Sequence, residues 1–122
     1  HIIRAALESI AYQTEDLIAA MEADFGGQIH DLKVDGGAAA NNFLMQFQSD
    51  ISDLCVRRPA GMEATALGAA LLAGLAVGFF RDREDIRSRI GGGTAFRPEM
   101  REDRRQALLD GWHRAVNACR SF

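Results

Sequence analysis

Apolar residues recur at helical spacing in several stretches of the chain, and shorter apolar runs separate these stretches. The spacing predicts helices over residues 1–24, 41–52, 63–80 and 102–120, with a short helical turn over residues 82–90. Residues 29–35 and 54–58 are typical of short strands, and the three glycines 91–93 predict a loop. This order favours an α/β layer with parallel strands and right-handed crossovers. Because two short strands make a thin sheet, we expect neighbouring strands to be missing.

The same periodicity predicts which side chains face the core. The first helix is expected to end at Gly26. Its inward positions are Ile3, Leu7, Ile10, Ala11, Leu17, Ile18 and Met21, and its solvent positions are Arg4, Glu8, Glu15 and Asp16. The inward positions of the later helices are Phe43, Leu44, Phe47 and Ile51, then Leu108, Leu109, Trp112, Ala115, Val116 and Cys119.

The third predicted helix carries no charged side chain between Ala64 and Phe80 and is rich in alanine and glycine. A membrane-spanning helix is one interpretation, but such helices need about 20 apolar residues and more large side chains than this stretch has. Close packing of a buried helix against a sheet explains the small residues better. At its front, Glu63 and Thr65 suit the first turn of a helix, although a carboxylate there could also contact a ligand.

Composition narrows the function classes. The chain has 122 residues, enough for one core, and its net charge of −3 argues against a nucleic-acid-binding surface. Cys55 and Cys119 lack the spacing of a metal site, so we expect no metal and a reduced, cytosolic pair of buried or half-buried thiols. Because the chain begins with His1 and helical periodicity starts at once, we expect a piece of a longer protein with no leader segment.

The chemistry-bearing segment is the run from Leu32 to Asn42, in which a strand leads through small residues into a helix. Gly36 and Gly37 lack a Cβ atom, so backbone there can approach a flat ligand closely. The start of the following helix offers free N–H groups to a phosphate, and Asn41 can either cap that helix or point its amide at a base. The segment lacks the Lys-Ser/Thr of a P-loop and the third glycine of a dinucleotide fingerprint. A plain strand-to-helix connection therefore stays open beside half of a nucleotide site.

Three segments resemble the FGGY carbohydrate kinases. Residues 1–14 resemble the end of the second signature pattern of that family, and residues 34–50 are similar to the adenosine motif of its glycerol-phosphorylating branch. Residues 63–78 are similar to the next helix of the same branch, and Phe96-Arg97-Pro98 and Gly111-Trp112 also match. The resemblance covers essentially the whole chain.

The resemblance implies one incomplete domain over residues 1–122, an α/β portion of an actin-like ATPase (ribonuclease H-like) domain. It implies a kinase that transfers the γ-phosphoryl group of MgATP to glycerol, giving sn-glycerol 3-phosphate. By position, Gly37 would lie near the α-phosphate and sugar, Asn41 would contact the adenine, and Gly36 and Ala38 would flank that pocket. The catalytic aspartate, the glycerol-binding residues, the phosphate loop and the metal ligands would all precede His1. We therefore expect no catalytic residue here and no activity from this portion alone.

The segment directly after Pro98 departs from that of some relatives. Some relatives have there a docking segment for a regulator, with a carboxylate for a shared zinc, whereas this chain has Arg104 at the carboxylate position. We therefore expect no such regulator site. The alternatives to a kinase portion are a non-catalytic assembly domain that keeps the fold and a membrane-associated helical module. Removed neighbours would leave apolar surface bare, so we also expect a homo-oligomer.

Overall fold

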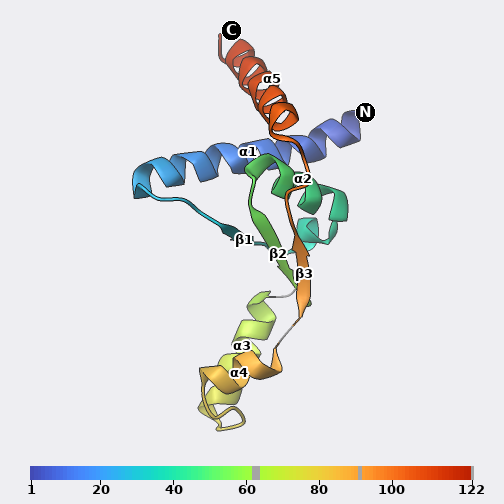
Figure 1. Ribbon diagram of the computed structural model, residues 1–122. Helices are drawn as coiled ribbons and strands as arrows, with labels where there is room; N and C mark the ends of the chain where they lie inside the picture. Colours follow the sequence, from blue (N-terminus) through green and yellow to red (C-terminus); the bar gives the residue numbers. More distant parts are fainter. Residues whose placement is uncertain (62–63, 91, 122) are drawn as a thin grey trace.

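The computed structural model describes residues 1–61, 64–90 and 92–121 (Figure 1). Their regular elements are α1 (Ile2–Phe25), β1 (Asp31–Lys33), the 3-10 turn η1 (Gly37–Ala40), α2 (Asn42–Ser52), β2 (Cys55–Pro59), α3 (Ala64–Ala76), α4 (Arg83–Arg89), β3 (Gly93–Phe96) and α5 (Glu102–Arg120). The predicted helices and both predicted strands are present, although β1 is shorter than expected. As predicted, α1 ends at Gly26, which has a φ of 68° and donates its N–H to Glu22.

The strands form one mixed sheet in the order β1-β2-β3. β1 pairs with β2 in parallel, with Leu32 opposite Val56, as the alternation of strands and helices predicts. β3 pairs with β2 in the antiparallel direction, with Phe96 opposite Val56. The prediction of a loop over residues 91–93 is therefore wrong at Gly93, which begins β3; Gly91 lies outside the described residues. The four residues of β3, Gly-Thr-Ala-Phe, contain one large apolar side chain and so show no alternation from which the strand could have been recognised.

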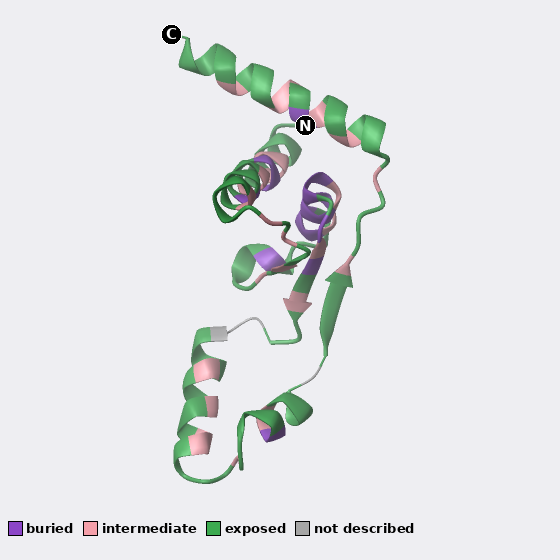
Figure 2. Ribbon diagram, turned by 60° about the vertical axis from the view of Figure 1, so that its left-hand side comes forward, coloured by how far each residue is buried: buried purple, intermediate pink, exposed green. Residues whose placement is uncertain are grey.

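Helix α2 lies between α1 and the sheet and forms the centre of the core (Figures 1 and 2). Its buried side chains share one face, because the apolar positions recur every three or four residues. Ile51 and Val56 are fully buried, and Tyr12 of α1 packs edge-on against Phe47 at a ring-centroid distance of 5.5 Å. The ring of Trp112 on α5 stacks on the other side of Tyr12 at 5.3 Å. Three helices are thus joined through one aromatic stack.

Several inward predictions are wrong because the core reaches only part of each helix. Of the expected inward positions of α1, Ala11 and Ile18 are buried and Leu7 packs against the core, whereas four others are exposed: Ile3, Ile10, Leu17 and Met21. Phe43 is also exposed, and on α5 only the first part of the apolar face is covered, so that Ala115 and Cys119 are exposed. Within the described part of the chain, nothing lies over the outer face of α1 to bury those side chains.

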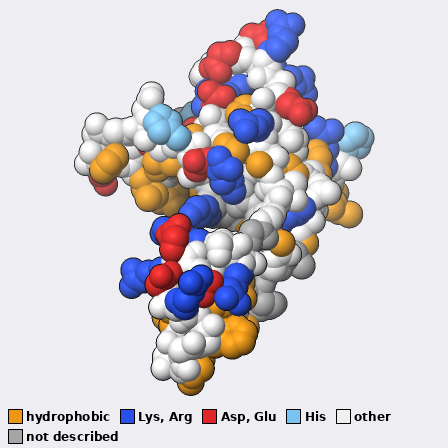
Figure 3. Space-filling model, turned by 60° about the horizontal axis from the view of Figure 1, so that its bottom comes forward, with side chains coloured by type: hydrophobic (Ala, Val, Ile, Leu, Met, Phe, Trp, Pro, Cys, Tyr) orange, Lys and Arg blue, Asp and Glu red, His pale blue; other side chains and the backbone are white. Residues whose placement is uncertain are grey.

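Helix α3 is not a buried helix, which corrects the sequence-based prediction. Together with α4 it forms an extension at one end of the sheet, and no residue described in α3 is buried (Figure 2). Leu72 is 69% exposed and Val77, just after the helix, is 81% exposed. Figure 3 shows hydrophobic side chains gathered at the lower end of the molecule, next to a group of charged side chains. The helix has the small residues needed for close packing, but the described sheet does not extend beneath it.

None of the described helices combines the length and the apolar character that a membrane crossing requires. The expectation for Glu63 lies outside the described residues. At the front of α3, Thr65 is exposed, as the first turn of a helix allows.

Candidate functional site

The candidate site is the turn between β1 and α2, which joins the carboxyl end of a parallel strand to the start of a helix. The N–H of Val34 donates to the carbonyl of Arg57 at 3.0 Å and so fixes the turn's entry to β2. Gly36 follows with a φ of 81°, a conformation that a residue with a Cβ rarely adopts. Two backbone hydrogen bonds between residues three apart form η1. They run from the Ala39 N–H to the Gly36 carbonyl and from the Asn41 N–H to the Ala38 carbonyl, and each is 3.1 Å long.

Asn41 caps α2. Its side-chain Oδ1 accepts the N–H of Leu44 at 3.1 Å, and its backbone carbonyl accepts the N–H of Met45. The cap uses only the oxygen of the side-chain amide. Within the described residues the Nδ2 group donates no hydrogen bond, so it remains able to donate to a ligand. Capping and base recognition, the two roles open for Asn41 at the sequence level, are therefore compatible.

The turn is open on its outer side. Apart from the immediate chain neighbours, no heavy atom of the described residues lies within 4 Å of the position that a Cβ would take on Gly36 or Gly37. Gly36, Gly37, Ala38 and Asn41, the four residues that the sequence predicts for a nucleotide site, are all exposed and lie in this one turn. Ala39 alone is buried, 2% exposed, and packs into the core. The backbone of Gly36 and Gly37 is therefore exposed at the surface, and the buried Ala39 anchors the turn in the core.

The start of helix α2 favours an anion. The first turn of α2 contains no acidic residue, so the partial positive charge of its N-terminus is not cancelled there. The guanidinium of Arg58, on β2, lies beneath and donates to the Ala39 carbonyl at 2.8 Å. Sequence reasoning assigned Arg58 to a strand and gave it no role. The sequence did contain an indication of this role. Because residues two apart in a strand share a face, Arg58 places a charged side chain on the same face of β2 as the buried Val56.

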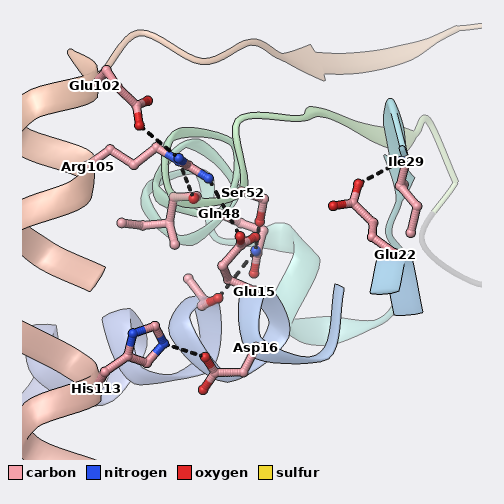
Figure 4. A network of polar contacts seen from close by, with 11 residues as sticks. Glu15, Asp16, Glu22, Ile29, Gln48, Ser52, Glu102, Arg105 and His113 are labelled. Atoms are coloured by element: carbon pink, nitrogen blue, oxygen red, sulfur yellow. Dashed lines mark hydrogen bonds and ion pairs between the residues drawn. The ribbon is translucent and has the colours of Figure 1, made fainter. Parts of the chain in front are cut away.

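A cluster of polar side chains, separate from the glycine turn, joins α1, α2 and α5 (Figure 4). Arg105 donates to the Ile51 carbonyl at 2.8 Å and lies 3.6 Å from a carboxylate oxygen of Glu15. Gln48 is buried and donates to the Ser52 hydroxyl and to the Ala11 carbonyl. The prediction of a solvent-facing Glu15 is wrong, because its side chain is only 14% exposed. This cluster holds the helices together and does not reach the glycine turn.

Burial raises the pKa of the Glu15 carboxyl, and the Ser52 hydroxyl and Arg105 oppose that shift only in part. One oxygen of this carboxyl, Oε2, is buried and has no hydrogen-bond partner among the described residues. Folding therefore shifts the protonation equilibrium of Glu15 toward the neutral acid. Its contribution to stability is complete below the ordinary pKa of about 4.5 and is lost as the pH rises through the raised value.

We expect Glu15→Gln to raise the melting temperature of the chain modestly at neutral pH, because a neutral amide replaces a desolvated carboxylate. The gain over the unaltered chain should grow as the pH rises and vanish in acid, where Glu15 is protonated. Calorimetric scans between about pH 4 and about pH 8 measure it, with the exposed Glu84→Gln as control. A gain that is equal at every pH would contradict the assignment to Glu15.

The cysteine prediction holds in part. Both thiols are free; Cys55 is half-buried, as expected, and Cys119 is exposed, which is not. Among the residues that the structure describes, no group of three or more His, Cys, Asp or Glu side chains could hold a metal ion.

The described chain thus combines a parallel strand–turn–helix unit in a small mixed sheet with an open turn and a helix start that has no acidic residue in its first turn. The chain belongs to the FGGY family of carbohydrate kinases: residues 1–77 match the C-terminal domain of that family. The whole chain is 57% identical to a glycerol kinase of Staphylococcus epidermidis, of which it covers 24%. Over 96% of its length it is 60% identical to a glycerol kinase of Alkaliphilus oremlandii, of which it covers 23%.

The fold agrees with a solved structure of the same class. The crystal structure of Plasmodium falciparum glycerol kinase with ADP matches 97% of this chain, with a TM-score of 0.85 and 34% sequence identity. The match covers 24% of that protein's chain. The family resemblance and the α/β, actin-like fold class predicted from the sequence are thereby confirmed. The chain spans about a quarter of the length of the relatives it matches.

Proposed function

We propose that this chain is the nucleotide-binding side of an ATP-dependent glycerol kinase. The longer protein transfers the γ-phosphoryl group of MgATP to a terminal hydroxyl of glycerol and releases sn-glycerol 3-phosphate and ADP. The relatives named glycerol kinase support the substrate, and the ADP in the Plasmodium falciparum structure supports the nucleotide. The chain contributes binding rather than the reacting groups, so alone it is inactive.

The observation that carries this proposal is the open main chain at Gly36 and Gly37, directly before the capped start of α2. A nucleotide can lie against Gly37 without meeting a side chain, with its phosphates directed toward the α2 N-terminus. Asn41 offers a free Nδ2 donor at the same turn, which suits an acceptor nitrogen of adenine. Gly36 and Ala38 would flank the nucleotide on either side of Gly37.

Phosphoryl transfer depends mainly on positioning and on compensating charge on the phosphates. The turn fixes the adenosine end, and it orients the triphosphate toward catalytic groups from the rest of the protein. We propose that magnesium arrives with ATP and is held by those groups. The protein acts in the cytoplasm, and the exposed apolar side chains of α3 pack against the rest of the protein or a second copy.

The test compares ADP binding by the full-length protein and its variants in a calorimetric titration. Gly37→Val is expected to weaken ADP binding at least about tenfold, because the new side chain occupies the space of the nucleotide. Asn41→Ala is expected to weaken it as well, and also to remove the cap of α2, so Asn41→Asp serves as a variant that keeps the cap but loses the donor.

Gly61→Val is the matched control, because no described residue beyond its chain neighbours lies within 4 Å of a Cβ there and Gly61 follows β2. Unchanged ADP affinity in Gly37→Val and Asn41→Asp would refute the nucleotide site. Retained ADP binding without phosphorylation of glycerol would instead show that another alcohol is the substrate, or that the fold serves as a non-catalytic assembly domain.

A further inference from the structure

One side chain ties the glycine turn to the sheet, and it belongs to Arg58. Its Nη1 donates to the Ala39 carbonyl at 2.8 Å and to Asn42 Oδ1 at 2.9 Å. Its guanidinium carbon lies 5.2 Å from the ring centre of Phe96, over the face of the ring. Arg58 therefore connects η1, the first residue of α2 and the neighbouring strand β3 through one rigid, planar group.

The two acceptors are the places where the turn most needs support. The backbone bonds of η1 use the carbonyls of Gly36 and Ala38, and Arg58 takes that of Ala39, the next one along. Because Ala39 is almost fully buried, loss of this donor would leave a carbonyl with little access to water. Asn42 is the residue directly after Asn41, so the second bond holds the helix start beside the adenine-facing amide.

The charge of Arg58 also stays available. Among the described residues no carboxylate lies within 4.0 Å of it, and its acceptors are a carbonyl, an amide and, at 3.5 Å, the Thr94 hydroxyl. The neighbouring Arg57 differs, because it pairs with Asp31 at 2.8 Å on the opposite face of β2. Arg58 thus adds an unpaired, half-buried positive charge beneath the N-terminus of α2.

We propose that Arg58 is a positioning residue for nucleotide recognition. By holding Ala39 and Asn42 it fixes Gly37 and Asn41 at the spacing that a bound nucleoside diphosphate or triphosphate needs, and its charge strengthens the anion-binding helix start. Arg58 itself does not contact the nucleotide. This inference rests on the proposed nucleotide site and names the residue on which the geometry of that site depends.

The test measures, in the full-length protein, the Kd for ADP, the KM for ATP, the KM for glycerol and the unfolding temperature without nucleotide. Arg58→Gln is expected to raise the ADP Kd and the ATP KM about tenfold and to leave the glycerol KM unchanged. Arg58→Lys keeps the charge and the donors but loses the planar group that lies over the Phe96 ring and reaches Thr94, so it should fall between. Arg57→Gln and Arg57→Lys are the same substitutions at the neighbouring residue, on the other face of β2, and should leave all four quantities nearly unchanged.

Two results would overturn the inference while leaving the proposed site intact. In the first, Gly37→Val weakens ADP binding but Arg58→Gln does not. In the second, Arg58→Gln raises both KM values equally and lowers the unfolding temperature in parallel, which is the behaviour of a merely structural residue. If Gly37→Val and Asn41→Asp leave ADP binding unchanged, the proposed site fails first, and the role of Arg58 fails with it.

Discussion

Gly93→Val is expected to destabilise the chain by about 3 kcal/mol or more, because two separate costs fall on one residue. The φ of Gly93 is 146°, a region that residues with a Cβ rarely adopt. A Cβ on Gly93 would also lie 2.5 Å from the Arg58 carbonyl oxygen and 3.2 Å from the Pro59 Cα, both of them backbone atoms that cannot rotate away. Strand β3 would have to move off the end of β2.

Urea unfolding, followed by circular dichroism, measures this cost, and Gly92→Val separates its two parts. Gly92 also has a positive φ, 97°, but its nearest neighbour is the Ala60 Cβ at 3.9 Å. Its substitution should therefore show the conformational cost alone, about 1–2 kcal/mol. If the two variants are equally stable, the backbone contact at Gly93 carries no energy and the β2–β3 register is not fixed there.

The same substitution bears on the site, because the carbonyl that meets the new Cβ belongs to Arg58. A shift at the end of β2 would carry the guanidinium away from Ala39 and Asn42. Gly93→Val should therefore weaken nucleotide binding in the full-length protein more than its loss of stability explains. The close contact between β3 and β2 at Gly93 thus fixes the end of β2 and, through the Arg58 side chain, the position of the glycine turn.

The sequence predicted the elements whose signals are local. Helical periodicity identified α1, α2 and α5, and Gly26 marked the end of α1 because a left-handed residue is needed there. The residues of the glycine turn were predicted together for the same reason: they are consecutive in the chain. That they bind a nucleotide stays a prediction, although the open space at Gly37 is what it requires.

The features that were missed depend on contacts between distant residues. Strand β3 begins at a glycine and is defined by its pairing with β2, not by its own pattern. The apolar periodicity of α1 places Glu15 on the polar side of the helix. Arg105 of α5 and Ser52 of α2 nevertheless contact its side chain. The apolar run of α3 predicted a buried helix, but burial requires an element that packs over it. Among the described residues only α4 lies beside α3.

Ile51→Ala is expected to destabilise the chain by about 3–4 kcal/mol, a large fraction of the total stability of a domain of this size. Ile51 is 0% exposed and lies where α2 packs between α1 and the sheet, so the smaller side chain leaves a cavity that rigid neighbours cannot close. Its carbonyl also accepts from Arg105, an interaction that the substitution leaves in place. The expected loss is therefore one of packing alone.

Urea unfolding of a three-variant series tests this interpretation. Ile51→Val, which removes one methyl group, should cost about 1 kcal/mol, and Ile3→Ala, at a position 80% exposed, should cost less than about 0.5 kcal/mol. Equal losses for Ile51→Ala and Ile3→Ala would mean that α2 is not the centre of the core. Because α2 carries Asn41 and the turn at its start, that outcome would also remove the rigid support on which the proposed nucleotide site depends.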